Sequence, residues 1–451
     1  MANLIVYMVT DTPTLMTSEL DRFQFSEVTK MMFKACVYMP TIVLGPVGGM
    51  LFDSLGPRKL LAMCYLLCVL GQGMIALAAQ NQWSSVAWFS GRLIYGCGSE
   101  LIAMCFNSVV QLWFETRTET TFGLTFALAM TRFTKRGGQG LGMLLSLLKP
   151  ASMALWIAFG AVLVGVVTTL PLFVLPILPS RLRRTTAMAK KKKLSFGMFM
   201  SAARLGGSFW LLAITTAIGY STWYTFAYFA AYMFRVLMMD KQIPMFMFAL
   251  MAAMCCPLVG ILVDRFTKPH YVKARWLVFT GLAYVTTYLC FMLLLRPLQG
   301  FHTGVWLIGL LLLGPAYGLV SVFTWPGLAV LVPSELTGAA TGIVVALKNL
   351  CASVVFPPAI VLLFLNSVGG QESAFIQRAS QKNFSFETSL THAEQEQAIS
   401  GVRAGLGVLV TMGVIFAVCA TLLWFAERRR KSSKPELECR RDSIALSMSQ
   451  G

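Results

Sequence analysis

A small set of charged side chains stands inside long apolar stretches of this sequence. The set comprises Asp11, Glu100, Arg132, Lys135, Arg136 and Lys348. If those stretches cross a bilayer, each charge near its centre costs about 3 kcal/mol, so a functional role is the first interpretation. An acid and a base together could hold the two ends of a zwitterion. No nucleophile–base pair, metal-ligand spacing or phosphate-binding loop accompanies them, so the sequence predicts neither an enzyme nor a cofactor.

Glu100 and Arg132 are predicted to lie at similar depths on neighbouring helices. Glu100 falls about fourteen residues into the stretch 86–114, which is roughly 21 Å along a helix. Arg132 falls about as far into 119–147, and a short connection makes the two helices antiparallel. The two residues can form a structural ion pair or grip a zwitterion, and the cost of intramembrane charge favours the second role. Arg92, near the lumenal end of the stretch 86–114, could equally snorkel to the interface or take part in function.

A polar stripe extends from Arg132 along its helix, because Lys135, Arg136 and Gln139 follow it at helical spacing. On an otherwise apolar helix, such a stripe should face a cavity or partner helices. Lys135 and Arg136 could neutralise Asp11, bind a substrate carboxylate or snorkel. Any proton coupling would use a buried carboxylate, since the histidines fall in or near predicted loops.

The second half of the chain supplies candidates of its own. Lys348, in the stretch 338–366, should face the basic stripe from the opposite side. Tyr220 and Tyr224 stand at helical spacing in 208–236. Packing is the simpler interpretation for them, although tyrosine hydroxyls prefer a polar partner and could line a cavity.

The elements that position these residues are predicted to be transmembrane helices. Hydrophobic residues make up 57% of the 451-residue chain and charged residues 12%, and about 20 apolar residues span a bilayer core as a helix. The pattern predicts spans at 1–17, 29–52, 60–80, 86–114, 119–147, 152–178, 208–236, 244–264, 275–296, 303–331, 338–366 and 402–426. The first span is short and contains Asp11, so we expect an upstream half-helix and a cytosolic leader. Pro326 and the pair Pro357–Pro358 could mark kinks in the later spans.

The net charge of +18 is distributed as in a membrane protein. Basic residues gather in alternate loops, at Arg58–Lys59, 181–193, 265–275 and 427–434, which the positive-inside rule makes cytosolic. The central loop then anchors the topology and could touch anionic lipid of the bilayer. Because aromatic residues do not interleave with this charge, a nucleic-acid partner is not expected.

A basic segment, 180–206, divides the chain into two halves of six predicted helices, 1–179 and 207–426. We therefore expect an all-α membrane protein of twelve helices, with two six-helix halves related by a pseudo-two-fold axis. Such proteins commonly bind their substrate between the halves, near the middle of the membrane.

Two polar segments lie outside the predicted helices of the second half. A lumenal loop, 367–401, contains the tripeptide Asn383-Phe384-Ser385, which permits N-glycosylation at Asn383. The C-terminal tail, 427–451, is charged and poor in aromatic residues, so it is predicted to be disordered.

A short signature is repeated at the cytosolic end of one helix in each half. Gly49 precedes Asp53 by four residues, as Gly260 precedes Asp264, and basic residues follow both. The repetition indicates duplication. The glycine lets a neighbouring helix approach closely, and the charges can bind across the halves when the cytosolic side is closed. We expect gating, rather than simple topology anchoring, from Gly49, Asp53, Arg58, Lys59, Asp264 and Arg265.

The signature GGMLFDSLGPRK and the segment GRLIYGCG resemble motifs of the major facilitator superfamily, although its antiporter motif is absent. The segments GCGSE, AMTR and TWPGLAVLVPSELTGAATG, the last followed by KNL, are similar to a branch that carries dipeptides across lysosomal membranes. The resemblance implies the major facilitator fold and uniport by alternating access, with Glu100 holding the amino end of a dipeptide and Arg132 its carboxylate. It adds Trp325 and Asn349 to the expected substrate-binding set, and it implies a glycosylated lumenal partner.

Three cations depart from that branch, since Lys135, Arg136 and Lys348 stand where it carries uncharged polar residues. They should disfavour cationic dipeptides and could favour neutral or acidic ones. We expect a carrier that exports dipeptides or similar small zwitterions from an acidic, lysosome-like lumen. An amino-acid or organic-anion carrier at the plasma membrane, and a non-transporting sensor or scaffold, are the alternatives.

Overall fold

The structure is a computed structural model of the whole chain. It describes residues 5–6, 9–10, 29, 32–33, 35–114, 126, 151–174, 196–236, 251–252, 254–259, 261, 274–293, 303–333, 336–367 and 392–449. Within these ranges every regular element is a helix, as the sequence predicts.

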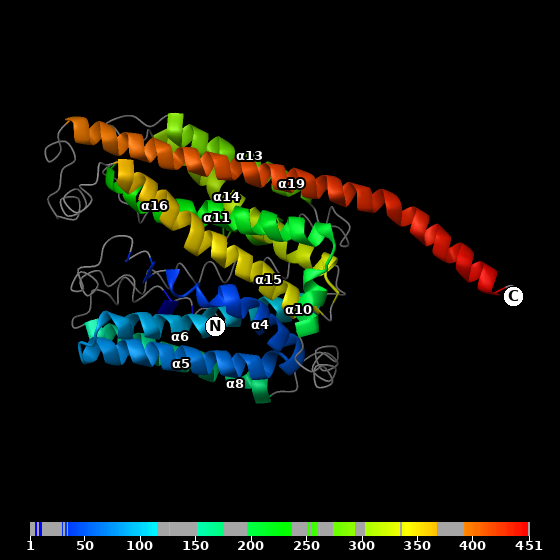
Figure 1. Cartoon of the computed structure of the whole chain (residues 1–451), viewed down its shortest axis with the longest axis horizontal. Coiled ribbons are helices and arrows are strands. Elements are labelled where there is room, and N and C mark those ends of the chain that lie inside the picture. The colour runs from blue at the N-terminus through cyan, green and yellow to red at the C-terminus, as the bar shows by residue number, and fades with distance from the viewer. Residues whose placement is uncertain are drawn as a thin grey trace.

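The helices form two groups (Figure 1). The first group comprises α4 (Pro40–Leu55), α5 (Pro57–Gln80), α6 (Ser85–Phe114) and α8 (Ala151–Val174). The second comprises α11 (Gly207–Val236), α13 (Ala274–Leu293), α14 (Thr303–Leu331), α15 (Thr337–Asn349), α16 (Phe356–Ser367) and α19 (His392–Ser449), with the short α10 (Phe196–Ala203) preceding α11. The limits of the two predicted halves remain a prediction, because the segment that joins them is largely outside the described residues.

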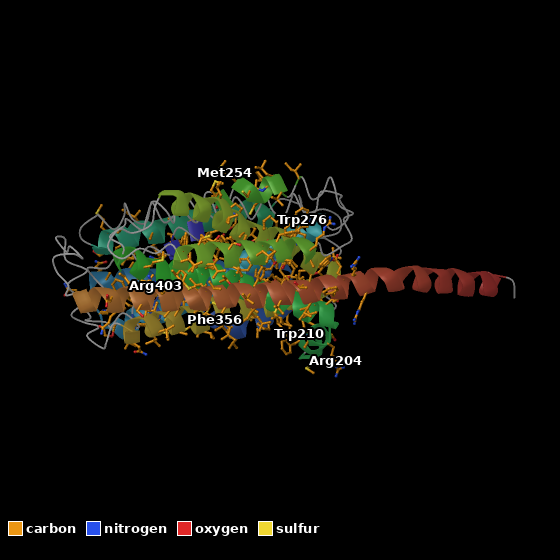
Figure 2. All side chains as sticks on the ribbon, turned by 90° about the horizontal axis from the view of Figure 1, so that it is seen from above. Arg204, Trp210, Met254, Trp276, Phe356 and Arg403 are labelled. Carbon is orange, nitrogen blue, oxygen red and sulfur yellow. The ribbon has the colours of Figure 1, made fainter. Side chains whose placement is uncertain are left out.

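Six helical segments in the described part of the chain are long and apolar enough to cross a membrane. They lie in α5, α8, α13, α14, the continuous run from α15 to α16, and α19. Large apolar side chains project from the outer surface of the bundle, as Met254 and Trp276 show with 55% and 40% of their surface exposed (Figure 2). A soluble protein would not leave so many apolar side chains in water, whereas lipid tails accept them.

The two groups of helices meet where α4 packs along α15. Gly45 and Gly49 of α4 face Gly342 and Gly338 of α15, and a Cβ atom at any of the four would collide with backbone atoms of the opposite helix. Small residues at these positions therefore allow the two backbones to touch, as is common where helices pack within membranes.

Proline affects the later helices in two different ways. Pro326 lies inside α14, which continues to Leu331, so this proline does not end the helix. Between α15 and α16 the chain forms a π-helix, Leu350–Val355, in which the N–H of Phe356 binds the carbonyl of Cys351. Pro357 and Pro358 follow directly and supply no N–H, so the carbonyls one turn earlier cannot form regular α-helical hydrogen bonds.

The C-terminal tail differs from its prediction, because α19 continues as a helix to Ser449 and projects away from the bundle (Figure 1). Residues 427–449 contain no glycine and many good helix formers, although Pro435 lies inside the helix and supplies no N–H. Since the last span already provides a helical nucleus, adding further turns is easier than starting a new helix. Glu427, the first residue of this segment, ties it to α13, because its carboxylate accepts a hydrogen bond of 3.3 Å from the N–H of Ala274 at the start of that helix.

The contact between α4 and α15 leads to a prediction for Gly49→Ala. We expect this change to lower stability by about 1–3 kcal/mol, because the added methyl group must separate two backbones that touch. Thermal unfolding of the purified protein measures the effect. Gly160→Ala in α8 is the matched control, since a Cβ there meets nothing within 4 Å. Equal melting temperatures for the two variants would contradict the close packing.

Candidate functional site

Glu100 lies at the meeting point of the two groups of helices. It belongs to α6 and only 4% of its surface is exposed. Its Oε2 atom is 3.7 Å from Nζ of Lys348 and accepts a hydrogen bond of 3.3 Å from Nδ2 of Asn349, both at the end of α15. Asn349 also donates a 2.6 Å hydrogen bond to Oγ1 of Thr41 on α4. The buried carboxylate is thus neutralised from the opposite group of helices.

Small residues beside Glu100 explain how α6 brings it to this point. A Cβ at Gly96 would collide with the backbone of Val37, and one at Gly98 would collide with the backbone of Cys64 on α5. The sequence GCGSE therefore lets α6 pack closely on two sides. Because Gly96 and Glu100 are four residues apart, they share one face of the helix, and this face turns toward the chain just before α4.

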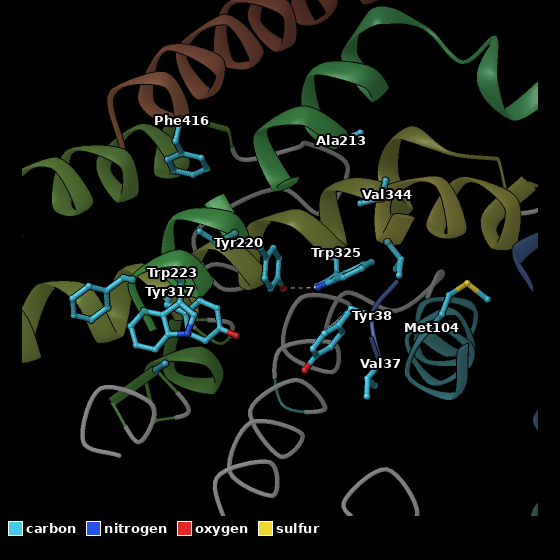
Figure 3. Close-up of a cluster of buried hydrophobic side chains, with 14 of the residues drawn as sticks. Val37, Tyr38, Met104, Ala213, Tyr220, Trp223, Tyr317, Trp325, Val344 and Phe416 are labelled. Atoms are coloured by element: carbon cyan, nitrogen blue, oxygen red, sulfur yellow. Dashed lines mark hydrogen bonds between the residues drawn. The ribbon is translucent and has the colours of Figure 1, made fainter. Parts of the chain in front are cut away.

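An aromatic and hydroxyl cluster completes the site from the second group. The hydroxyl of Tyr220 on α11 accepts a 3.0 Å hydrogen bond from Nε1 of Trp325 (Figure 3). The same hydroxyl is paired with the hydroxyl of Ser321 at 2.5 Å. The ammonium of Lys348 lies 5.6 Å from the centre of the Tyr220 ring, within the range of a cation–π interaction. Tyr220 thus has the polar partner that a buried tyrosine requires and also faces a charge.

Tyr224, one helical turn further along α11, packs against another aromatic ring. Its ring meets Tyr317 edge-on, with ring centres 6.3 Å apart. Tyr317 in turn stacks on Trp223 at 4.5 Å with an angle of 12° between the planes (Figure 3). The contacts described for Tyr224 are therefore those of a packed aromatic cluster.

Arg92 does not snorkel, and that alternative is wrong. Only 1% of its surface is exposed. Its guanidinium donates a 2.5 Å hydrogen bond to the carbonyl of Thr10 and lies 5.3 Å from the centre of the Phe33 ring. One turn along α6, the hydroxyl of Tyr95 donates a 2.6 Å hydrogen bond to the carbonyl of Val6. Both side chains fasten α6 to the N-terminal segment, because each donates a hydrogen bond to one of its carbonyls.

Asp53 connects the groups of helices a second time, at the other end of α4. One carboxylate oxygen accepts a 3.0 Å hydrogen bond from the N–H of Gly338, and the other accepts a 2.9 Å bond from the N–H of Ala339. These N–H groups belong to the first turn of α15, where a helix favours a negative charge. Nearby, Arg58 is half-buried and Lys59 is exposed at the start of α5.

The structure therefore brings Glu100, Lys348, Asn349, Tyr220 and Trp325 into one connected cluster. Sequence reasoning missed Thr41 and Ser321, because a single hydroxyl in an apolar helix has no distinguishing pattern. Seven predicted residues lie outside the described part of the chain: Asp11, Arg132, Lys135, Arg136, Asp264, Arg265 and Asn383.

Residues 1–356 match the Major Facilitator Superfamily. The chain is 25% identical over 360 residues to the lysosomal dipeptide transporter MFSD1 of Danio rerio, covering 76% of this chain and 74% of that protein. Two solved structures share the fold at 14% identity. The human organic anion transporter MFSD10 has a TM-score of 0.63 and coverages of 93% and 97%. The proton:xylose symporter XylE has a TM-score of 0.61 and coverages of 92% and 92%.

The Asp53 contact leads to a prediction for Asp53→Ala. We expect a loss of about 1–3 kcal/mol in stability, since two N–H groups at the start of α15 lose their acceptor. Thermal unfolding detects the change. The neighbouring Ser54→Ala is the control, because the Ser54 hydroxyl donates a hydrogen bond within its own helix, to the carbonyl of Leu51 at 3.4 Å. If Ser54→Ala proved as harmful as Asp53→Ala, the contact across the groups would not account for the loss.

Proposed function

The chain belongs to the Major Facilitator Superfamily and is a membrane transporter, not an enzyme, and we propose that it carries dipeptides or similar small zwitterions by alternating access. In this proposal the direction is export, from a lysosome-like lumen to the cytosol, by uniport. The observation that carries the proposal is the buried carboxylate of Glu100, which both groups of helices surround.

Alternating access requires a binding site whose two walls move apart in turn. The Glu100 cluster has this composition. Glu100 and Thr41 come from α6 and α4, while Lys348, Asn349, Tyr220 and Trp325 come from α15, α11 and α14. Separating the two groups of helices would therefore break the cluster and expose its charges.

The charges of the cluster match those of a zwitterion. A substrate ammonium would pair with Glu100 and lie against the face of Tyr220, as the Lys348 ammonium does here. A substrate carboxylate would pair with Lys348, together with Arg132, Lys135 and Arg136. We call these four cations the basic wall, and a position for Asp11 near them is part of the same proposal. The similarity to the Danio rerio dipeptide transporter supports both the substrate class and the lysosomal membrane.

The cytosolic gate would be the seam between α4 and α15. From Thr41 to Asp53 this seam is packed, with hydrogen bonds at both ends and touching glycines between them. We propose that release of substrate to the cytosol opens this seam, with Arg58 and Lys59 stabilising its closed form. The repeated signature in the second half, with Asp264 and Arg265, would act in the same way.

Other parts of the prediction belong to this proposal as well. They are the halves 1–179 and 207–426 with their linker 180–206, glycosylation at Asn383, and a glycosylated lumenal accessory protein. The presence of Lys348 in the cluster favours one second candidate, an organic-anion or amino-acid carrier at the plasma membrane, because an extra cation attracts carboxylates.

Counterflow of labelled glycylglycine in proteoliposomes tests the proposal. We expect Glu100→Gln and Arg132→Ala each to lower uptake at least tenfold, which corresponds to about 1.4 kcal/mol of lost binding. Glu396→Gln, at an exposed position in α19, should leave uptake unchanged and serves as the matched control. Uptake that tolerates Glu100→Gln would reject the site, and binding of glycylglycine without flux would favour a sensor.

Competition between charged dipeptides tests the basic wall. We expect glutamyl dipeptides to inhibit glycylglycine counterflow more strongly than lysyl dipeptides, because the extra cations repel a second ammonium. The ratio of their inhibition constants is the measurement, and Lys135→Gln should bring it closer to one. A wild-type preference for lysyl dipeptides would show that Lys135 and Arg136 do not reach the substrate.

A further inference from the structure

Lys348 occupies the position that a substrate ammonium would take. Its Nζ atom lies 3.7 Å from the Glu100 carboxylate and 5.6 Å from the centre of the Tyr220 ring. A carboxylate beside an aromatic face is a common arrangement for holding an ammonium group. Lys348 is itself largely enclosed, with 14% of its side chain exposed.

The contact between Lys348 and Glu100 is loose. A charge-assisted hydrogen bond between an ammonium and a carboxylate is about 2.7–2.9 Å long, whereas Nζ and Oε2 are 3.7 Å apart. The same oxygen already accepts the amide N–H of Asn349 at 3.3 Å. Lys348 therefore balances the charge of Glu100 without forming the shortest possible bond, and a ligand ammonium could bind more closely.

We propose that Lys348 is a tethered substitute for the substrate ammonium, which the substrate displaces on binding. This inference rests on the proposed function. In the empty transporter Lys348 neutralises Glu100, which avoids the large penalty of leaving a buried carboxylate unpaired. When a zwitterion binds, its ammonium takes the place beside Glu100, and the displaced Lys348 pairs with the ligand carboxylate.

The exchange keeps Glu100 and Lys348 paired. Among the described residues the cluster holds one anion, Glu100, and one cation, Lys348, and a zwitterion adds one charge of each sign. Lysine suits the exchange because its ammonium sits at the end of a flexible four-carbon chain and can move while its backbone stays fixed. Lys348 thereby determines specificity. A ligand with an ammonium but no carboxylate would leave Lys348 unpaired in a buried site, so the transporter rejects it.

Binding of glycylglycine and its C-terminal amide, glycylglycinamide, tests the proposal in the purified full-length protein. Isothermal titration calorimetry gives the two dissociation constants. We expect the wild type to bind glycylglycine at least tenfold more tightly than the amide. In Lys348→Met the ratio should fall at least tenfold, because Glu100 then needs a cation and the bound amide no longer leaves a displaced Lys348 without a partner.

Two further variants separate charge from shape. Lys348→Arg keeps the cation and should keep the preference for glycylglycine. Arg403→Met removes an exposed cation from α19 and should also leave the ratio unchanged. If Lys348→Met does not fold, Lys348→Gln replaces it, and the wild-type ratio alone remains decisive, since equal affinity for the two compounds overturns the proposal.

The outcomes distinguish this inference from the proposed function. If the wild type carries glycylglycine and Glu100→Gln abolishes uptake, but Lys348→Met keeps the wild-type ratio, only the role of Lys348 is rejected. If the wild type binds neither compound, the proposed substrate class is wrong and the tethered-cation mechanism fails with it.

Discussion

A carboxylate in the middle of an apolar bundle must be neutralised, and this requirement organises the described structure. Glu100 is buried on α6, yet its cation and one of its hydrogen-bond donors come from α15, in the other group of helices. A buried charge without a partner would be strongly unfavourable. The electrostatic balance of one group therefore depends on its contact with the other, and any movement between them must supply a replacement partner.

The seam between α4 and α15 combines polar contacts, including one to Glu100, with close packing of the two backbones. At one end Asn349 binds Thr41 and Glu100, and at the other Asp53 binds the first turn of α15. Between these polar ends, glycines on both helices let the backbones touch. Hydrogen bonds fix the ends and close contact fills the middle. In the described structure the seam is packed along its length, with polar contacts at its ends and backbone contact between them.

The sequence predicted the fold well because hydropathy in membrane helices is a strong and simple signal. The predicted span 60–80 corresponds to α5 at Pro57–Gln80, and 303–331 corresponds to α14 at Thr303–Leu331. Charges inside apolar stretches also gave Glu100 and Lys348, since such residues are rare enough to stand out. The partners were harder to predict. Lys348 comes within 3.7 Å of Glu100, a contact that depends on the rotation of two helices from different groups. Thr41 was missed, and Arg92 was assigned an alternative that the buried N-terminal segment excludes.

The π-helix Leu350–Val355 rotates the side chains of α16 about the helix axis relative to those of α15. Side chains advance by about 100° per residue in an α-helix, so a wider segment offsets the faces presented before and after it. Here α15 packs mainly along α4 and α16 packs along α19, while α11 contacts both pieces. The two pieces thus present different faces to α4 and to α19, and both keep a contact with α11. The π-helix therefore lets one continuous span meet α4 of one group of helices with its first part and α19 of the other group with its last part.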